Sequence, residues 1–322
     1  MTGVQTCALP ISPTGAPPLR PRPRPLSARM APALLLAPAV VLVLVALAYP
    51  MVRQLVMSFQ EFGLAQQFGQ PAEWVGLQNY ANILSDPYFW SVFGKSVAFC
   101  FWTAGWTMLG ALGFALLMRS ASAPARTFMN IVLVVVWAMP LIASLTVWQW
   151  LVDANFGLLN HVLTGAGLDG FAGFSWLASS PWTFYLIASA VIVWASMPLA
   201  TITIYSALSQ VDDALLEAAQ LDGAGYLGRL RNVIFPTIMP VVSLIGVLQV
   251  IWDLRVFTQI HVLQQSGGIT QQTNLLGTYV YQVGIAQGDY GTASALAMII
   301  LLLTLVMTAK YLQMLWTQGD IR

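Results

Sequence analysis

Charged residues are scarce in this chain, which holds 13 lysines and arginines and 12 aspartates and glutamates among 322 residues. They make up 8% of the sequence, against about 25% in soluble proteins. Hydrophobic residues make up 58%. This composition excludes an ordinary soluble globular fold, and the net charge of +1 gives no indication of nucleic-acid binding.

Cysteine and histidine are also scarce, with two residues of each. Cys7 and Cys100 make no disulfide framework, and no Cys/His cluster has metal-ligand spacing, so we predict no metal site. His161 and His261 have no clustered partner, and we expect loop or interface positions for both. An intramembrane hydrolase is disfavoured, because its Ser/His or paired-Asp constellation does not appear within the apolar runs.

Six apolar runs are long enough to cross a bilayer, which takes about 20 helical residues. They are residues 31–49, 91–118, 128–151, 181–208, 237–263 and 291–315. Pro50 marks the end of the first run or a kink in it, and Pro140 lies inside the third. Gly291–Ala295 opens the sixth run with small residues, which favour close helix packing in lipid. The sequence therefore predicts an all-α membrane protein with six transmembrane helices.

Residues 1–29 contain seven prolines and an alternating Arg-Pro run, so we predict a disordered tail there and a membrane domain over residues 30–322. The first twelve residues resemble a translated sequencing adapter read from a GTG start. In that case they are an assembly artefact, and Cys7 carries no information.

A polar island interrupts the apolar runs, since four of the twelve acidic residues fall between Asp212 and Asp222. Ser209 and Asp212 have capping-box spacing, which predicts a helix start, and Gly223 supplies a helix stop. A second short helix is expected from Tyr226 to Asn232, closed by Pro236 and Pro240. The island is therefore predicted to be a helix-turn-helix outside the membrane.

This island resembles the loop of permease subunits in binding-protein-dependent ABC importers, where Glu-Ala-Ala precedes a Gly and then an aliphatic-x-apolar-Pro at fixed spacing. The matching residues are Glu217, Ala218, Ala219, Gly223, Val233, Phe235 and Pro236. Asp222, Ala224 and Pro240 resemble the carbohydrate branch of the maltose, glycerol-phosphate and chitobiose type. Gly76–Tyr80 and Phe156–Asn160 are similar to two further loops of these permeases.

In that family the loop forms coupling helices that seat in a groove of the ATPase subunit. The resemblance therefore implies an ATPase-coupling role for Glu217, Ala218, Ala219, Asp222, Gly223, Ala224 and Pro236. It implies four kinds of partner: a second permease, a pair of ATP-binding cassette ATPases, an extracytoplasmic solute-binding protein and a sugar substrate. The expected mechanism is alternating access, in a subunit that is not itself an enzyme.

No cofactor is expected in this chain, since ATP would be used by the partner. Gly94-Lys95-Ser96 looks like the end of a phosphate-binding loop. The motif also requires a glycine five residues before Gly94, but that position holds Phe89. A continuous apolar helix also leaves no room for a loop that binds phosphate. An importer for a non-sugar solute remains an alternative. So does an ion-driven secondary transporter, although only Asp253 is an acid inside a run and no internal repeat is clear.

Basic residues predict the orientation. With six spans, ten of the thirteen fall on one side: Arg20, Arg22, Arg24, Arg29, Arg119, Arg126, Arg229, Arg231, Lys310 and Arg322. The positive-inside rule then places the N-terminus and the polar island in the cytoplasm of a bacterial cell, with the chain in its cytoplasmic membrane.

Six residues are candidates for the substrate path: Trp148, Trp194, Trp252, Asp253, Arg255 and Tyr281. Aromatic rings can stack on sugar faces, but most membrane tryptophans are interface anchors or packing residues. Asp253 and Arg255 lie in the fifth run, where charge must face protein or water. Two residues apart on a helix they point away from each other, so each makes either a structural contact or a path contact.

Overall fold

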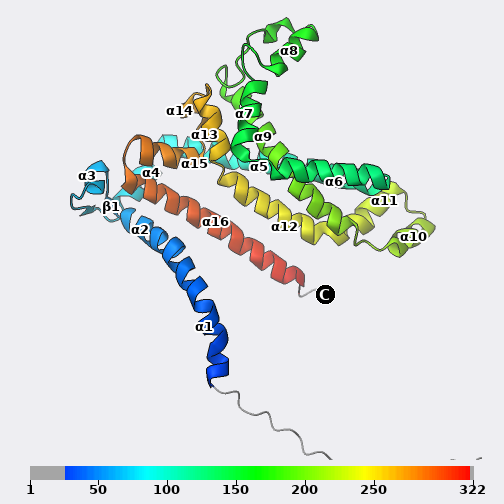
Figure 1. Cartoon of the computed structure of the whole chain (residues 1–322), viewed down its shortest axis with the longest axis horizontal. Coiled ribbons are helices and arrows are strands. Elements are labelled where there is room, and N and C mark those ends of the chain that lie inside the picture. The colour runs from blue at the N-terminus through cyan, green and yellow to red at the C-terminus, as the bar shows by residue number, and fades with distance from the viewer. Residues whose placement is uncertain (1–25, 320–322) are drawn as a thin grey trace, which may run out of the picture. The chain divides into compact units, whose positions relative to one another are not determined.

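The computed structural model describes residues 26–319, which are almost entirely helical (Figure 1). The predictions for residues 1–25 lie outside the described residues. The chain divides into two compact units, Met1–Arg53 and Gln54–Arg322.

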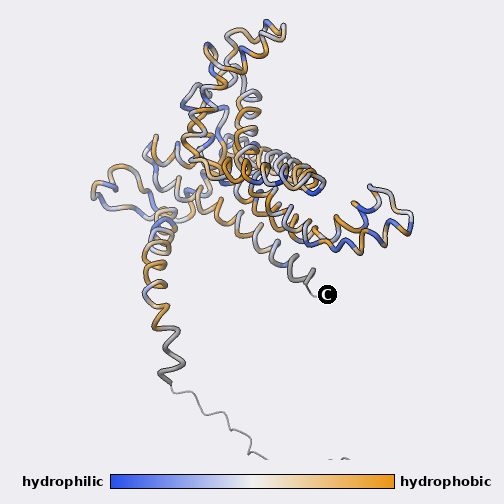
Figure 2. The backbone as a smooth tube through the Cα atoms, turned by 45° about the vertical axis from the view of Figure 1, so that its right-hand side comes forward, coloured by the Kyte–Doolittle hydropathy of each residue, from blue (hydrophilic) through white to orange (hydrophobic). Residues whose placement is uncertain are grey.

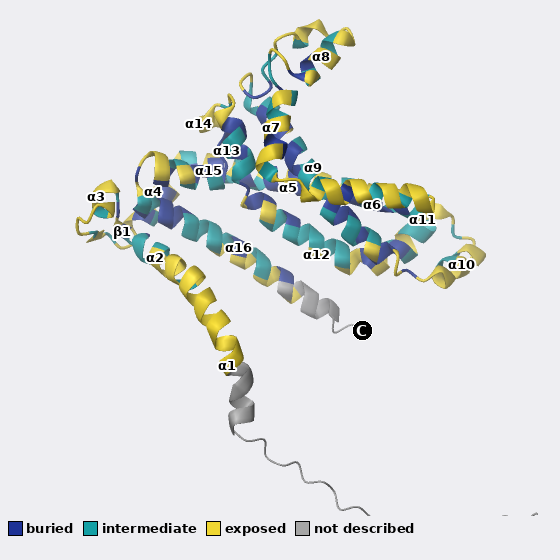
Figure 3. Ribbon diagram, in the orientation of Figure 1, coloured by how far each residue is buried: buried dark blue, intermediate teal, exposed yellow. Residues whose placement is uncertain are grey.

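The first unit holds α1 (Leu26–Val43), the π-helical turn η1 (Leu44–Ala48) and the start of α2 (Tyr49–Met57). Helix α1 begins at Leu26, inside the predicted tail. The apolar stretch Leu34–Met57 is long enough to span a membrane. None of the residues in its most apolar 18-residue segment is buried (Figure 3). The first predicted span is confirmed, but its end is not at Pro50. A proline is tolerated in the first turn of a helix, and the widened turn η1 directly precedes α2.

The second unit is built on long helices and a bent pair. The long helices are α5 (Pro87–Ser120), α9 (Pro181–Leu208), α12 (Phe235–Leu254) and α16 (Tyr290–Gly319), and the bent pair is α6 (Ala123–Ala138) with α7 (Leu141–Leu151). The shorter helices are α3 (Leu64–Gln67), α4 (Gln78–Ser85), α8 (Leu158–Gly165), η2 (Asp169–Phe171), α10 (Asp213–Leu221), α11 (Tyr226–Arg229), η3 (Leu230–Ile234), α13 (Thr258–Gln265), α14 (Thr270–Thr273), α15 (Leu276–Tyr281) and η4 (Gln282–Ala286). A small antiparallel pair is formed by β1 (Gln60–Glu61) and β2 (Glu73–Trp74). Figure 2 shows hydrophobic stretches along the long helices and more hydrophilic ones in the connections.

Helices α5 and α9 begin where the local sequence provides a cap. Asp86 accepts a hydrogen bond from the Tyr88 backbone N–H at 2.9 Å, and Ser180 accepts one from the Trp182 N–H at 3.2 Å. Each cap is followed by a proline, which suits the first helical position because no hydrogen bond is lost there. The second span therefore starts at Pro87, four residues before the predicted start.

Close packing of α5 against α9 forms the centre of the unit. Ala111 and Ala115 on α5 and Ala200 on α9 are buried in one cluster with Ile204. A β-carbon added at Gly110 would lie 2.6 Å from the Met197 sulfur, so a larger residue could not fit without movement. Small side chains let membrane helices approach closely, which is how these two stay together without a hydrophobic driving force.

The third predicted span is broken. Helices α6 and α7 meet at an angle of 98° across Met139 and Pro140, where a single continuous helix over residues 128–151 was expected. Met139 is extended, with φ −65° and ψ 134°, because the residue before a proline is disfavoured in the helical region. Pro140 acts as a break between two helices and not as a kink within one.

The bent pair nevertheless crosses the membrane once. Arg119, near the end of α5, donates to the carbonyl oxygen of Leu208, the last residue of α9, at 3.1 Å. Both helices are long enough to span, and their C-terminal ends meet, so they run in the same direction. Residues 121–180 must therefore return to the opposite side, and α6 with α7 is the apolar segment that can do so. The prediction of six spans is confirmed in this form.

The two ends of the unit carry different structures, which we call the α10 end and the α15 end (Figure 1). The α10 end holds the C-termini of α5 and α9 together with α10 and α11. The α15 end holds the starts of α5 and α16, the β1–β2 pair and α13–α15.

A hydrogen bond at the α15 end joins α15 to the residue before α5. Burial next to Asp86 raises the pKa of Tyr279 to about 12, so the Tyr279 hydroxyl stays protonated and donates to the Asp86 carboxylate at 3.4 Å.

Candidate functional site

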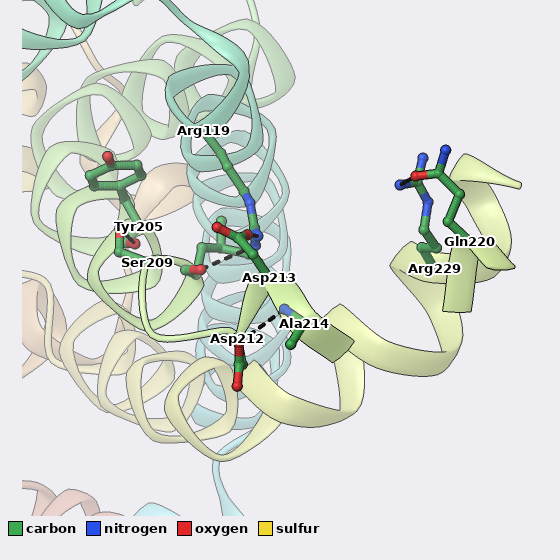
Figure 4. A network of polar contacts seen from close by, with 9 residues as sticks. Arg119, Tyr205, Ser209, Asp212, Asp213, Ala214, Gln220 and Arg229 are labelled. Carbon is green, nitrogen blue, oxygen red and sulfur yellow. Dashed lines mark hydrogen bonds and ion pairs between the residues drawn. The ribbon is translucent and has the colours of Figure 1, made fainter. Parts of the chain in front are cut away.

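The predicted polar island forms helix α10 and the turn after it. Asp212 is the N-cap, since its Oδ1 accepts a hydrogen bond from the Ala214 backbone N–H at 2.9 Å. Figure 4 shows this contact. The predicted capping box at Ser209 is wrong, because the Ser209 hydroxyl instead donates to the Tyr205 carbonyl at the end of α9. The acidic side chain therefore satisfies one of the free N–H groups at the start of α10.

Gly223 ends α10, as predicted. Its φ of +83° lies in the left-handed region, which a glycine adopts without the steric conflict of a β-carbon. The Ala224 N–H then donates to the Ala219 carbonyl at 2.9 Å, which closes the helix end. The sequence thus fixes the shape of this turn locally.

The second helix of the island does not end where expected. Helix α11 continues through η3 into α12, which ends at Leu254, and α13 begins at Thr258, so the predicted fifth span over residues 237–263 is interrupted at residues 255–257. Pro236 and Pro240 lie within the continuous stretch of α11, η3 and α12 and do not close the unit, contrary to the prediction. The wide turn η3 accounts for this, because it shifts the backbone hydrogen bonds directly before Pro236, which cannot donate one.

The surface of α10 and α11 combines an acid with exposed leucines. Glu217, Ala218 and Asp222 are exposed, as Figure 3 shows for the helix as a whole. Leu221 is 90% exposed, and Leu215 and Leu227 are exposed as well. These three leucines, which we call the exposed leucines, were missed in the sequence analysis. Large apolar side chains on a polar loop could have indicated them, because exposed apolar patches mark contact surfaces.

Other side chains of the island hold it to the bundle. Leu216 of α10 and Leu230 of η3 pack against the buried cluster that contains Ile204 and Ile238. Arg229 donates to Gln220 at 3.1 Å and ties α11 to α10 (Figure 4). One face of α10 is therefore anchored, while the face with Glu217 is left open.

Arg119 connects this island to α5. Its guanidinium donates to the Leu208 carbonyl and lies 3.4 Å from the Asp213 carboxylate (Figure 4). It thus places a cation at the C-terminus of α9 and at the first residue of α10, where its charge is favourable for both partners. The sequence analysis counted Arg119 only for orientation, because no spacing rule indicates a contact across about 90 residues.

The substrate-path candidates fall into separate places. Trp148 of α7 and Trp194 of α9 form an edge-to-face pair with ring centroids 6.1 Å apart. Tyr281 instead lies against Phe257 and His261, at centroid distances of 5.3 and 4.6 Å. Trp252 is half exposed on α12. Among the six candidates, the structure thus brings the rings of Trp148 and Trp194 into contact.

Asp253 faces protein and not water, the two environments expected for a charged residue within a span. It is 3% exposed and accepts hydrogen bonds from Gln249 at 2.9 Å and from the Thr103 hydroxyl of α5 at 2.8 Å. Arg255 is exposed at the end of α12, and the described residues show no ion pair between it and Asp253. Asp253 therefore joins α12 to α5, a contact that sequence spacing could not reveal.

Within residues 26–319, no group of three or more His, Cys, Asp or Glu side chains is arranged to hold a metal ion. Gly94, Lys95 and Ser96 lie inside the continuous helix α5, so the helix predicted at this position is confirmed. His161 lies on α8 and is exposed.

Comparison with known proteins identifies the family. Residues 111–314 match the family described as binding-protein-dependent transport system inner membrane component. The chain is 35% identical over 291 residues to the diacetylchitobiose uptake system permease protein DasB of Streptomyces coelicolor, covering 90% of this chain and 88% of that protein. It is 31% identical to the sulfoquinovosyl glycerol transport system permease protein SmoG of Agrobacterium fabrum, covering 90% and 92%.

A solved structure shares the fold. It is a bacterial ABC transporter involved in the import of the acidic polysaccharide alginate, with a TM-score of 0.77, 20% identity, and coverage of 90% of this chain and 97% of that one. Together with six membrane crossings and the island at the α10 end, the family match over most of the chain leads to one conclusion. This chain is a multi-pass permease subunit that belongs to the family of inner-membrane components of binding-protein-dependent transport systems.

Proposed function

We propose that this chain carries a carbohydrate through the membrane and that a separate ATPase drives it by binding α10. The observation that carries the proposal is the open face of α10, where Glu217 and Leu221 lie one turn apart on a helix that is itself anchored to α5 and α9. A helix of this kind can receive force from a partner and pass it to the spans.

The substrate class is proposed from the relatives. Both curated relatives described above are named for sugar-containing substrates, a diacetylated disaccharide and a sulfoquinovosyl glycerol. Uncharged sugars bind through aromatic faces and hydrogen bonds, and the Trp148–Trp194 pair offers such faces between two spans. We propose this pair as the first part of the path to test, with Trp252, Asp253, Arg255 and Tyr281 as further candidates.

The partners follow from the same proposal. A second permease, a pair of ATP-binding cassette ATPases and an extracytoplasmic solute-binding protein would complete the transporter. The chain itself would bind no nucleotide and catalyse no reaction. Its α10 end would face the cytoplasm, and with a single span before the α15 end the N-terminus would lie in the cytoplasm as well.

The mechanism would be alternating access. Closure of the ATPase pair would move α10, and Arg119 and Asp213 would transmit that movement to α5 and α9, whose starts lie at the opposite end. A small displacement of α5 and α9 at the α10 end would then open the substrate path at their opposite ends, because long helices move as rigid bodies.

The test is the substitution Glu217→Arg. We expect membrane insertion to be unchanged and ATP-dependent uptake in reconstituted vesicles to be lost, because a cation replaces the acid that faces the ATPase. Asp169→Arg is the matched control, since it makes the same charge change at an exposed position between α8 and α9. Normal uptake by the Glu217 variant would contradict the coupling role.

The substrate class is tested separately with the unmodified transporter. Vesicles loaded with ATP are offered labelled oligosaccharides, glycerol phosphate and amino acids, in the presence of the cognate solute-binding protein. Uptake of an oligosaccharide supports the proposal. Uptake restricted to amino acids would overturn the substrate class while leaving the coupling role standing.

A further inference from the structure

A large cavity opens at the α15 end of α5 and α9, and neither α10 nor any of the six path candidates lines it. Its volume is about 720 Å³, within the range of ligand-binding pockets. Five large side chains line it: Phe99, Trp102, Trp182, Tyr185 and Leu186. These are aromatic or aliphatic, so the interior suits a hydrocarbon better than a sugar, which needs hydrogen-bond partners along its whole length.

The depth of this cavity in the membrane follows from α5. No charged residue occurs between Lys95 and Arg119. These two residues are 24 positions apart, or about 36 Å along a helix, against a hydrocarbon core of about 30 Å and a bilayer of about 40–45 Å with headgroups. Both cations can therefore reach headgroups, one on each face. The wall residues Phe99 and Trp102 then lie one to two turns deeper, among acyl chains.

Lys95 forms part of the polar rim. Its ammonium group donates to the Gln272 carbonyl at 3.1 Å and lies 6.0 Å from the centre of the Tyr88 ring. No carboxylate lies within 4.0 Å of it in the described part of the chain. An ammonium group has three donors, so this rim offers an unneutralised cation with further donors at headgroup depth.

We propose that this cavity binds one anionic phospholipid, with its phosphate at Lys95 and an acyl chain along Phe99 and Trp102. The charge of Lys95 selects the headgroup, and the aromatic wall holds the chain. Trp102 and Trp182 are largely exposed despite lining the cavity, as expected for rings that a lipid covers. The lipid would touch α14 at the rim and both central helices below it.

The experiment measures lipid binding to the purified full chain by native mass spectrometry, with phosphatidylglycerol and phosphatidylcholine as probes. Lys95→Ala is expected to weaken phosphatidylglycerol binding about fivefold, the factor that one lysine contributes at an anionic membrane surface, and to leave phosphatidylcholine unchanged. Lys95→Arg keeps the charge and should keep the selectivity. Lys310→Ala removes an exposed lysine on α16 and serves as the charge control.

The wall is tested with a matched pair of tryptophans. Trp102 lines the cavity and is 52% exposed, while Trp106, one turn away, does not line it and is 51% exposed. Trp102→Ala is expected to weaken binding of both lipids, and Trp106→Ala is not. This pair separates loss of the site from loss of exposed aromatic surface, and retention of a monodisperse, thermally stable protein is measured for each variant.

Three results would overturn the proposal. The first is equal phosphatidylglycerol binding by the Lys95→Ala and Lys310→Ala variants. The second is displacement of the lipid by millimolar inorganic phosphate or glycerol phosphate, which would show a site for a small soluble anion. The third is efficient disulfide formation, with an added oxidant, between Ala98→Cys and a cysteine introduced into the second permease, which would show that a protein covers the cavity.

Discussion

At the α15 end, side-chain hydrogen bonds of the buried Asn274 join α5, α13 and η4, whereas at the α10 end a surface helix is held by two leucines and two arginines. Asn274 is completely buried, donates to the Tyr88 hydroxyl at 2.9 Å and also to Gln282, and accepts from Gln264 at 3.2 Å. Among the described residues of the α10 end, no comparable buried network occurs: the Glu217 side chain makes no hydrogen bond, and Leu221 is almost fully exposed.

This difference shows at which end the polar and apolar side chains find their partners within this chain. A buried polar network holds one arrangement when all its members are satisfied, since any alternative leaves groups unpaired. Exposed leucines beside an acid leave apolar surface in water, which a partner can cover. We therefore regard the α15 end as a rigid platform and the α10 end as a surface completed by assembly.

The largest expected effect is on the platform. Asn274→Leu removes the shared partner of Tyr88, Gln264 and Gln282 and leaves buried polar groups unsatisfied, at about 1–3 kcal/mol for each such group. We expect a clear fall in melting temperature in detergent, together with loss of uptake. Gln271→Leu, an exposed position beside the network, is the control. Unchanged stability of the Asn274 variant would show that the platform is not held by this network.

The second effect should appear only on assembly. Leu221→Asp changes a side chain that the fold does not bury, so the melting temperature of the isolated chain should stay the same. Association with the ATPase should weaken at least tenfold, as expected for an apolar contact in an interface. Phe68→Asp is the control, because Phe68 is 86% exposed at the other end. Equal ATPase binding by both variants would remove the functional difference between the ends.

A smaller effect is expected at Arg119, where the α10 end meets the spans. Arg119→Ala removes one charge-assisted hydrogen bond and one exposed ion pair, together about 1–3 kcal/mol at most. We expect less substrate transported for each ATP hydrolysed, with ATPase binding retained, because the loop would still dock but move α5 less. The double variant Arg119→Asp with Asp213→Arg should restore part of the ratio of substrate transported to ATP hydrolysed. An unchanged ratio in Arg119→Ala would exclude this link.

The smallest effect concerns the loop after α7. Asp153 accepts hydrogen bonds from the backbone N–H groups of Phe156 and Asn155, each at 2.8 Å, and these lower its pKa from the ordinary value of 3.8. A lowered carboxyl pKa means that the stabilisation is present above the ordinary pKa and is lost as pH falls through the lowered one. The protection of the 153–157 backbone amides from hydrogen exchange, relative to their intrinsic rates, should fall in acid, and Asp153→Asn should remove that dependence. Acid exchange identical in both proteins would contradict it.

Two loops that resemble the family show how far sequence reasoning reached. Asn79 lies in the first, is buried and donates to the carbonyls of Ser58 and Gln60. Asn160 ends the second, donates to the Phe174 carbonyl and accepts from the Trp176 indole. Both asparagines were part of recognised patterns, but a pattern does not say which distant carbonyls a side chain reaches.

The wrong predictions at Pro140, Pro236 and Ser209 have the same cause, since a local pattern does not determine tertiary contacts. Length and hydropathy predicted the spans because the bilayer demands about 20 apolar residues whatever the partners are. The 98° break at Pro140 and the passage of the helix through Pro236 could not be predicted, since a proline can break, kink or begin a helix. Ser209 and Asp212 were both acceptable caps by residue type, and only the backbone path decided between them.

The sequence by itself determined that this is a membrane protein with six crossings, that Gly223 ends the helix containing Glu217, and that the resemblance to importer permeases lies in that helix. These depend on composition, chain length and local backbone preference, which need no distant contacts. The tertiary structure alone decided that Asp253 is held by Thr103, that Arg119 joins α5 to α9 and α10, and that an apolar cavity opens beneath Lys95. Each of those results from helices packed side by side, and packing brings together residues whose separation in the chain carries no information about their distance in space.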